Sequence, residues 1–216
     1  MPKSVTDSFC FLFDKTNSFS TKTIQIRYNK FNQRGIKMSI YYTRHGKTSW
    51  NESHRIQGRV DVPLSIEGKE EANKLANDLK EIPLDLVFSS PLSRALETAR
   101  IALAGRNVAI IQDKRIIELN YGDFEGFSHD DEKILCKRSC FASRYPNGES
   151  YLDAAKRIYL FFDELKEKYP DKNILVVGHL GIARIVNSYF LDMSNDEFIH
   201  FQIANCELLK YEFPRK

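Results

Sequence analysis

Short apolar runs and longer stretches with helical spacing alternate along this chain. The runs are rich in β-branched and aromatic residues and predict strands at 39–43, 85–88, 108–111, 173–177 and 207–213. The segment at 173–177, Asn-Ile-Leu-Val-Val, is continuously apolar after its first residue, which is typical of a central strand covered on both faces. The strands are therefore expected to form a sheet inside the protein.

Between these runs, apolar residues recur every three or four positions, which predicts helices that each pack one face on the sheet. The predicted helices span 66–80, 91–102, 151 to the residue before Pro170, and 182–191. Strands interleaved with helices in this order predict a three-layer α/β/α sandwich with a mainly parallel central sheet. The segment 120–148 lacks such a period and is expected to be irregular.

Polar residues mark the beginnings of these helices. Ser65, Ser90 and Ser150 are expected N-caps, with Pro91 at the first helical position after Ser90 and Asp153 completing a capping box with Ser150. The expected buried face of the long helix carries Leu152, Ala155, Ile158 or Tyr159, Phe162 and Leu165. Arg94 falls in the first turn of its helix, off the buried face predicted from Leu92, Ala95, Ala99 and Ala102.

Charge is unevenly distributed along the chain. Residues 1–37 carry seven Lys and Arg against two Asp, a net charge of +5, so the rest of a chain with a total of +3 carries −2. A mildly acidic body argues against nucleic-acid binding, which needs a basic surface on the folded domain. No apolar run approaches the ~18 residues that a membrane helix requires. The four cysteines form no metal-type cluster, and reduced thiols in a cytoplasmic protein are expected.

The basic, Ser/Thr-rich segment 1–37 is interpreted as a leader outside the catalytic domain. Met38 directly precedes the first predicted strand, where a compact domain would begin. Three interpretations stay open: a targeting or regulatory tail, a disordered arm, or sequence upstream of the true start. In each case residues 38–216 are expected to fold and act without the leader.

Residues that could take part in catalysis follow several predicted strands. Arg44 and His45 come after the first strand, Arg94 lies in the turn and helix after the second, and His179 follows the strand at 173–177. In open α/β sheets, sites gather at the carboxyl ends of strands. An imidazole that titrates near ~6.5 is largely an uncharged nucleophile at neutral pH, and a neighbouring guanidinium can hold a phosphate. Arg44 and His45 therefore indicate phosphoryl transfer.

With Glu118 from the segment after the third strand, these residues fall into four blocks that resemble the histidine phosphatase superfamily, in its phosphoglycerate mutase-like branch. The blocks occur in the order that is typical of that family and extend over nearly all of 38–216. They are Thr43-Arg44-His45-Gly46-x-Thr48-x-x-Asn51, Ser89-Ser90-Pro91-Leu92-x-Arg94-Ala95-x-x-Thr98-Ala99, Glu118-Leu119-x-Tyr121-Gly122-x-Phe124-Glu125-Gly126, and Val176-Val177-Gly178-His179.

The resemblance implies a role for each matching residue. His45 would attack phosphorus and become transiently phosphorylated, and Glu118 would protonate the leaving oxygen and then activate water. The residues expected to bind the phosphoryl group or its ester are Arg44, Asn51, Gln57, Arg94, His179 and the backbone of Leu180. Two guanidiniums with a histidine supply the charge that a loose transition state needs, so neither a metal nor another cofactor is expected.

Two positions depart from the family's pattern. Lys47 stands where an acidic residue is usual, and Gly178-His179-Leu180 replaces the more usual Ser-His-Gly, so that Leu180 is expected to narrow the site. These departures affect the expected substrate preference and leave the expected chemistry unchanged.

The resemblance favours a phosphatase of small metabolites over a cofactor-dependent phosphoglycerate mutase. The segment 120–148 is short, whereas a mutase usually has a longer insertion with paired arginines, and Lys137-Arg138 is interpreted as a solvated helix face. A catalytically inactive phospholigand binder fits poorly because the nucleophile, acid and clamps are all present. A small phosphomonoester is the expected partner, without nucleic acid or membrane, and a homodimer is left open. Candidate walls of the leaving-group pocket are Trp50, Tyr121, Phe124, Phe127 and Tyr145, with Phe124 the best candidate for ordinary core.

Overall fold

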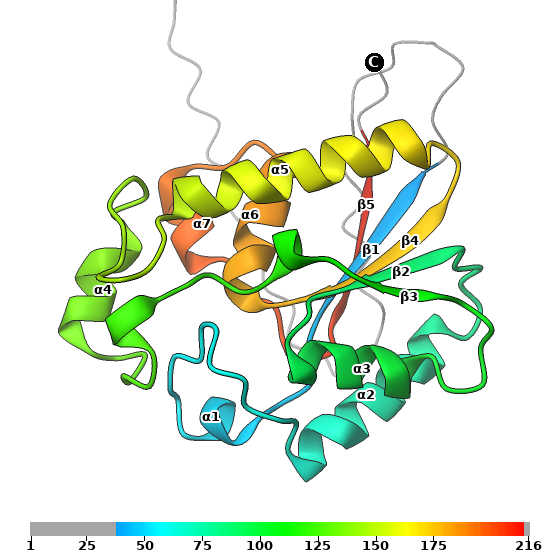
Figure 1. Ribbon diagram of the computed structural model, residues 1–216, viewed down its shortest axis with the longest axis horizontal. Coiled ribbons are helices and arrows are strands. Elements are labelled where there is room, and N and C mark those ends of the chain that lie inside the picture. The colour runs from blue at the N-terminus through cyan, green and yellow to red at the C-terminus, as the bar shows by residue number, and fades with distance from the viewer. Residues whose placement is uncertain (1–37, 214–216) are drawn as a thin grey trace, which may run out of the picture.

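The computed structural model describes residues 38–213, which contain a five-stranded sheet in the order β3-β2-β4-β1-β5 (Figure 1). The strands are β1 (Ser39–Arg44), β2 (Leu86–Ser89), β3 (Ile110–Gln112), β4 (Asn173–Gly178) and β5 (Leu208–Glu212). β1, β2, β3 and β4 pair in parallel, and β5 runs antiparallel to β1 at one edge. The predicted mainly parallel sheet is therefore confirmed.

Helices cover both faces of this sheet. They are α1 (Ser49–Glu52), α2 (Ile66–Leu79), α3 (Ser93–Ala102), α4 (Glu132–Arg138), α5 (Tyr151–Lys168), α6 (Leu180–Phe190) and α7 (Asn195–His200), with short 3-10 turns at Lys114–Ile116 and Gly122–Phe124. In Figure 1, α5 lies above the sheet, and α2 and α3 lie below it. The predicted three layers are confirmed.

The side chains of β4 show why the sheet needs two helical layers. Ile174 and Val176 are fully buried in the cluster that includes α5 and α6, whereas Leu175 and Val177 are fully buried in the cluster that includes α2 and α3. Neighbouring strand residues point to opposite faces, so a continuous apolar run must be covered on both. Each buried side chain of this kind contributes about 1.5–3 kcal/mol relative to an exposed one.

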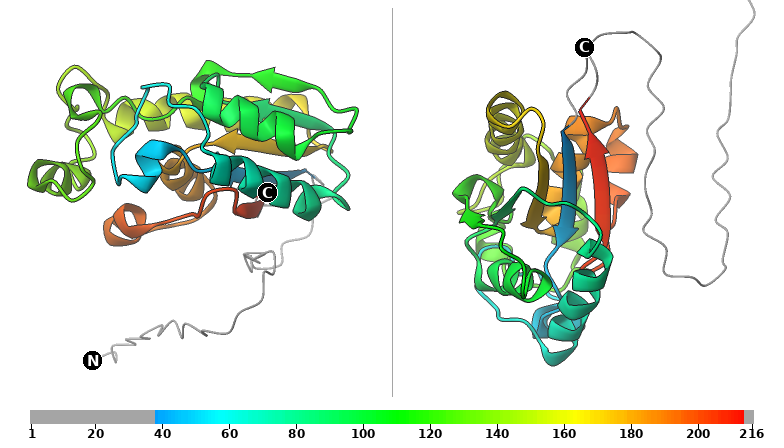
Figure 2. Two further views of the ribbon diagram at one scale, coloured as in Figure 1. Left: turned by 90° about the horizontal axis from the view of Figure 1, so that it is seen from below. Right: turned by 90° about the vertical axis from the view of Figure 1, so that its right-hand side faces the viewer.

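The α1 segment and α4 lie at the end of the sheet toward which β1 and β4 run (Figures 1 and 2). The segment 120–148, predicted to be irregular, contains a 3-10 turn and α4. An antiparallel bridge between Arg55 and Ser128 joins the loop after α1 to this segment. The loop after α1 and the segment 120–148 therefore together cover the carboxyl edge of the sheet.

The predicted N-cap at Ser90 is wrong. α3 begins at Ser93, and its N-cap residue, Leu92, makes no side-chain capping bond. The Ser90 hydroxyl lies 2.7 Å from Nε2 of His179, and Oδ1 of Asp61 accepts from the backbone and the hydroxyl of Ser93, each at 2.8 Å. A distant carboxylate thus satisfies the start of the helix, which leaves the Ser90 hydroxyl available to His179.

The long helix α5 begins as predicted, and Ile158, Phe162 and Leu165 are buried as predicted, but the buried positions of its first turns are shifted by one residue. Ser150 is the N-cap and forms a capping box with Asp153. Tyr151 and Ala154 point into the core, whereas Leu152 is 58% exposed. The prediction for Leu152 is wrong because the large Tyr151 ring occupies the inward position of the first turn, where it packs edge-on against Phe198.

The predicted leader, residues 1–37, lies outside the described residues. Within residues 38–213, no helix is both long enough and apolar enough to cross a bilayer.

One tyrosine links the two central strands at the point where both end. The Tyr42 hydroxyl donates to the carbonyl of His179 and accepts from the amide of the same residue, each at 2.8 Å. A Cβ on Gly178 would lie 2.3 Å from the Tyr42 hydroxyl oxygen, so only glycine permits this approach. Tyr42 on β1 therefore holds the backbone of the residue that follows β4.

We expect Tyr42→Phe to lower the free energy of unfolding by about 1–3 kcal/mol, because the amide of His179 is left buried without a partner, whereas its carbonyl still accepts from the amide of Ala183. Urea unfolding followed by circular dichroism measures the change. Tyr41→Phe is the matched control, since Tyr41 is partly buried on the same strand and its hydroxyl makes no hydrogen bond with the described residues. Equal midpoints for the two variants would contradict this role for Tyr42.

Candidate active site

His45 leaves β1 with its ring in a defined orientation. Its amide donates to the carbonyl of Gly178 at 3.0 Å, and Asn205 donates to its carbonyl at 2.7 Å. The ring nitrogen Nδ1 lies 2.7 Å from the carbonyl oxygen of Gly46. A carbonyl can only accept, so Nδ1 carries the proton and Nε2 keeps a free lone pair. Burial lowers the pKa of His45 well below 6.5, and the charges of Arg94 and Arg44 lower it further.

His179 lies beside His45 and is fully buried. The two ring centroids are 5.1 Å apart. The Ser90 hydroxyl oxygen accepts from the amide of Leu92, so its own hydrogen is free to be donated to Nε2 of His179. The Nδ1 atom of His179 is buried without a partner among the described residues. Burial, followed by the charge of Arg94, lowers the pKa of His179 well below 6.5.

Two guanidiniums flank the histidines, and each guanidinium donates to neutral backbone carbonyls. Arg94, predicted to lie off the apolar face of its helix, is fully buried and donates to the carbonyls of Val60 and Gly58 at 2.8 and 2.7 Å. Arg44 donates to the carbonyl of Ile203 at 3.2 Å. The Nε atoms of Arg44 and Arg94 are buried without a partner among residues 38–213. Burial lowers the pKa of Arg94 to about 10, so Arg94 stays charged at neutral pH.

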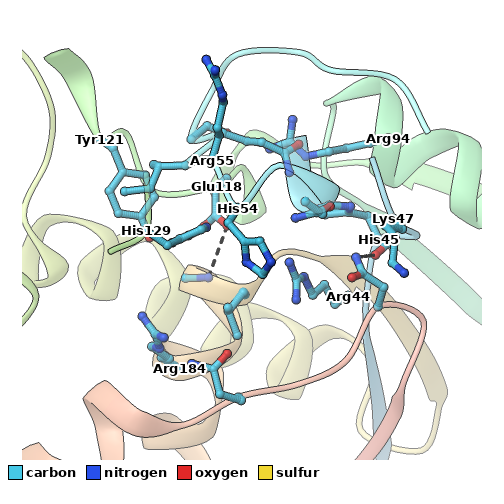
Figure 3. Close-up of a pocket in the computed structure, with 18 of the residues that line it drawn as sticks. Arg44, His45, Lys47, His54, Arg55, Arg94, Glu118, Tyr121, His129 and Arg184 are labelled. Atoms are coloured by element: carbon cyan, nitrogen blue, oxygen red, sulfur yellow. Dashed lines mark hydrogen bonds between the residues drawn. The ribbon is translucent and has the colours of Figure 1, made fainter. Parts of the chain in front are cut away.

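Glu118 is buried, and two amides bind its carboxyl group. Oε1 accepts from Leu119 at 2.8 Å, and Oε2 accepts from Gly181 at 3.2 Å (dashed line in Figure 3). Burial raises the pKa of Glu118 above 4.5, although these amides and Arg94 favour the charged form. A carboxyl group whose pKa is raised gives up a proton less readily than an exposed one, and its carboxylate form can accept one.

An ion-pair network holds the backbone that carries Glu118. The Arg157 guanidinium on α5 donates to the carbonyls of Arg115, Ile117 and Glu118, the last two at 2.8 and 3.3 Å. Arg157 is paired at 2.7 Å with Glu149, which also accepts from the amide of Asn120 at 3.0 Å. The segment after β3 is irregular, so these bonds take the place of a strand or helix in positioning the carboxyl group.

The remaining predicted site residues line the same cavity. Asn51 uses its side-chain oxygen to cap α1 through Thr48, which turns its amide nitrogen away from the cap. Gln57 is 7% exposed, and its Oε1 has no partner among the described residues. Leu180 is the first residue of α6 and lies at the cavity wall.

The cavity has a volume of about 360 Å³. This size falls within the range of small-molecule pockets. Its lining includes Arg44, His45, Asn51, Gln57, Arg94, Glu118 and Leu180. The buried ring of His179 lies next to the cavity, with its centroid 5.1 Å from that of His45. Of the predicted aromatic walls, Tyr121 alone is among the described lining residues.

Sequence reasoning missed several cationic or titratable residues of the cavity. They are His54, Arg55, His129, Arg138 and Arg184 (Figure 3 labels all except Arg138). The interpretation of Arg138 as part of a solvated helix face is wrong, because its side chain lines the cavity. Arg184 could have been identified from the sequence as a candidate site residue, since it interrupts an otherwise apolar helical run. Lys47 lines the cavity, but its ammonium group is paired with Glu67 at 2.5 Å.

No group of three or more His, Cys, Asp or Glu side chains with the geometry to hold a metal ion occurs within residues 38–213.

Comparison with known proteins places this geometry in a family. The model of the histidine phosphatase superfamily (branch 1) matches residues 40–216. The 2,3-bisphosphoglycerate-dependent phosphoglycerate mutase of Cytophaga hutchinsonii is 28% identical over 188 residues, covering 82% of this chain and 88% of the relative. Phosphoserine phosphatase 1 of Hydrogenobacter thermophilus is 27% identical over 176 residues, covering 78% and 83%. The mycobacterial glucosyl-3-phosphoglycerate phosphatase, solved as a complex with VO3, is 26% identical with a TM-score of 0.72, covering 80% and 91%.

We expect the His45 ring to be neutral at pH 6.5, with its proton on Nδ1. Its pKa is lowered, so the unprotonated form predominates at and above pH 6.5, and protonation requires a lower pH. Long-range proton–nitrogen NMR distinguishes the two neutral tautomers and the imidazolium. His45→Gln identifies the signals by removing them. An imidazolium at pH 6.5, or a proton on Nε2, would contradict the orientation described above.

Proposed function

This chain belongs to the histidine phosphatase superfamily, and on that premise we propose that it is a metal-independent phosphomonoesterase of small phosphorylated metabolites, acting through a phosphohistidine. One observation carries the proposal: a neutral imidazole with a free Nε2 lone pair lines the same cavity as two guanidiniums whose Nε donors are buried and unused among the described residues. Relatives named as phosphatases support the reaction class.

In the first step, Nε2 of His45 attacks phosphorus, and the bond from phosphorus to the ester oxygen breaks. Glu118 transfers its proton to that oxygen, which leaves as an alcohol. Burial raises the pKa of Glu118, which favours the protonated form that this step uses. Proton delivery by a positioned acid of this kind typically contributes about 10²- to 10⁴-fold.

In the second step, the Glu118 carboxylate takes a proton from water, and the water oxygen attacks phosphorus. The phosphorus–nitrogen bond breaks, inorganic phosphate is released, and His45 and Glu118 return to their starting forms. One group thus serves as acid and then as base.

The transferring group spreads its charge over three equatorial oxygens, which need fixed donors more than covalent assistance. The Nε donors of Arg44 and Arg94 are available for this purpose. The Nδ1–H of His179 is available as well, because the Ser90 hydroxyl donates to Nε2 and the ring proton is therefore on Nδ1. Asn51 and Gln57 lie at the same cavity and complete the proposed ester-binding set. These donors are proposed to supply the charge stabilisation without a metal.

The second candidate is a phosphoglycerate mutase, which the Cytophaga hutchinsonii relative and the arginines of the cavity favour. A mutase must keep water from the phosphohistidine and hold an intermediate while it reorients, which requires a substantial lid. The segment 120–148 supplies one short helix, α4, and we therefore favour hydrolysis. A cytoplasmic location is proposed because the described cysteines, Cys136, Cys140 and Cys206, are free thiols.

Rapid quenching with a labelled phosphomonoester should trap a phosphoenzyme that is labile in acid and stable in base, as a phosphoramidate bond is. The label should be absent in His45→Ala, because the attacking lone pair is removed. Recovery of the label on serine, or near-normal turnover by His45→Ala, would refute the phosphohistidine mechanism.

Phosphorus NMR of 3-phosphoglycerate with catalytic 2,3-bisphosphoglycerate separates hydrolysis from isomerisation. We expect mainly inorganic phosphate, because Glu118 has water within reach once the alcohol has left. Both products appear as separate signals in one sample. Accumulation of 2-phosphoglycerate faster than inorganic phosphate would make the mutase the correct assignment.

A further inference from the structure

The cavity contains more positive charge than one phosphoryl group requires. Arg44 and Arg94 match the two charges of a phosphomonoester, and Glu118 is the one acidic residue among the described lining residues. Arg138 and Arg184 line the same cavity, and neither forms an ion pair with any residue in 38–213. Their two charges therefore remain uncompensated.

Arg184 is the more deeply buried of these two side chains and is only 4% exposed. Its Nε donates to the carbonyl of Phe201 and its Nη1 to the hydroxyl of Tyr151, both at 3.2 Å. The remaining nitrogen, Nη2, has no acceptor among the described residues. A buried cation held only by neutral groups is destabilising unless an anion joins it.

Arg138 reaches the cavity from α4 and is tied to His129. Its Nη2 lies 3.0 Å from Nδ1 of His129 and 3.2 Å from the carbonyl of the same residue. A guanidinium can only donate, so Nδ1 of His129 is the unprotonated nitrogen and Nε2 carries a proton. Burial and the charge of Arg138 lower the pKa of His129 to about 4, so the ring is a neutral donor at neutral pH.

These groups lie apart from the phosphoryl-binding residues. In Figure 3, His129 and Arg184 lie on one side of Glu118, and His45 and Arg94 lie on the other. Glu118, the group proposed to protonate the leaving oxygen, therefore lies between the two cationic ends. A substrate with its phosphate at His45 would extend its leaving group toward the second end.

We propose that Arg138, Arg184 and His129 form a second anion-binding site, so that the substrate is a phosphomonoester whose leaving group carries a carboxylate or a second phosphate. This inference rests on the proposed function, because it assumes that the phosphate to be cleaved is bound at His45. A leaving group without charge would leave both guanidiniums unmatched.

The test compares ligands that differ only at the distal end, using binding to the full-length His45→Ala protein by titration calorimetry. The carboxylate arm compares 3-phosphoglycerate with glycerol phosphate, which has a hydroxymethyl group in place of the carboxylate. The phosphate arm compares propane-1,3-diol bisphosphate with its monophosphate. We expect the doubly functional ligand of at least one pair to bind roughly ten- to hundred-fold more tightly, the range of a charge-assisted hydrogen bond.

Arg138→Gln and Arg184→Gln, each added to His45→Ala, should reduce this ratio toward one, and Arg138→Lys should retain part of it because it keeps the charge. Lys133→Gln is the matched control, since it removes an equal charge from an exposed position of the same helix. Thermal unfolding shows whether the buried Arg184 variant folds, and Arg138→Gln, at a partly buried position, tests the site if it does not.

Equal affinities within both pairs would overturn the second site, as would a ratio that survives Arg138→Gln in a folded protein. Turnover of p-nitrophenyl phosphate by the wild-type protein tests the proposed function separately, because this substrate has no second anionic group. A wild-type protein that hydrolyses p-nitrophenyl phosphate but shows no preference within either pair retains the proposed function and refutes the second site. A wild-type protein that releases inorganic phosphate neither from p-nitrophenyl phosphate nor from any ligand of the two pairs, but shows a preference that Arg138→Gln removes, refutes hydrolysis and supports the second site.

Discussion

The parallel pairing of β1 with β4 is the constraint on which the rest of the site depends. Its register places Arg44 opposite Gly178, so His45 and His179 leave the sheet at the same level. The bond from the amide of His45 to the carbonyl of Gly178 extends the pairing by one residue, and Tyr42 fixes the residue beyond it. A slip of one residue would move the rings about 3.3 Å apart along the strands and invert the faces of β1.

The site keeps its positive charge because the guanidiniums are anchored by carbonyls and not by carboxylates. Arg94 binds the carbonyls of Gly58 and Val60, Arg44 binds that of Ile203, and Arg184 binds that of Phe201. A carbonyl orients a guanidinium without neutralising it, whereas a buried carboxylate would cancel the charge that an anionic ligand needs. Burial, followed by the charges of Arg94 and Arg44, lowers the pKa of both histidines, so cations and a neutral nucleophile coexist.

The features that could be predicted from the sequence are those that depend on residues close together in the chain. The apolar run at 173–177, the period of α2 and the capping box at Ser150 each arise from neighbouring residues, and the structure confirms them. The failures involve partners far apart in the chain. Ser90 binds His179 because Asp61, from another loop, satisfies the start of α3. Arg138 reaches the cavity because α4 packs at the carboxyl edge of the sheet, a placement that no periodicity encodes.

The departure at Leu180 illustrates how little of the proposed acid–base chemistry depends on that side chain. A Cβ at residue 181 would lie 2.6 Å from Oε1 of Glu118, so the glycine there makes room for the carboxyl group. Leu180 precedes it and packs against the hydrophobic core while also lining the cavity. Its side chain therefore shapes the pocket without displacing Glu118, whose second oxygen is held by the amide of Gly181. Glycine at 181, and not the residue directly after His179, is the local requirement for the placement of the proposed acid.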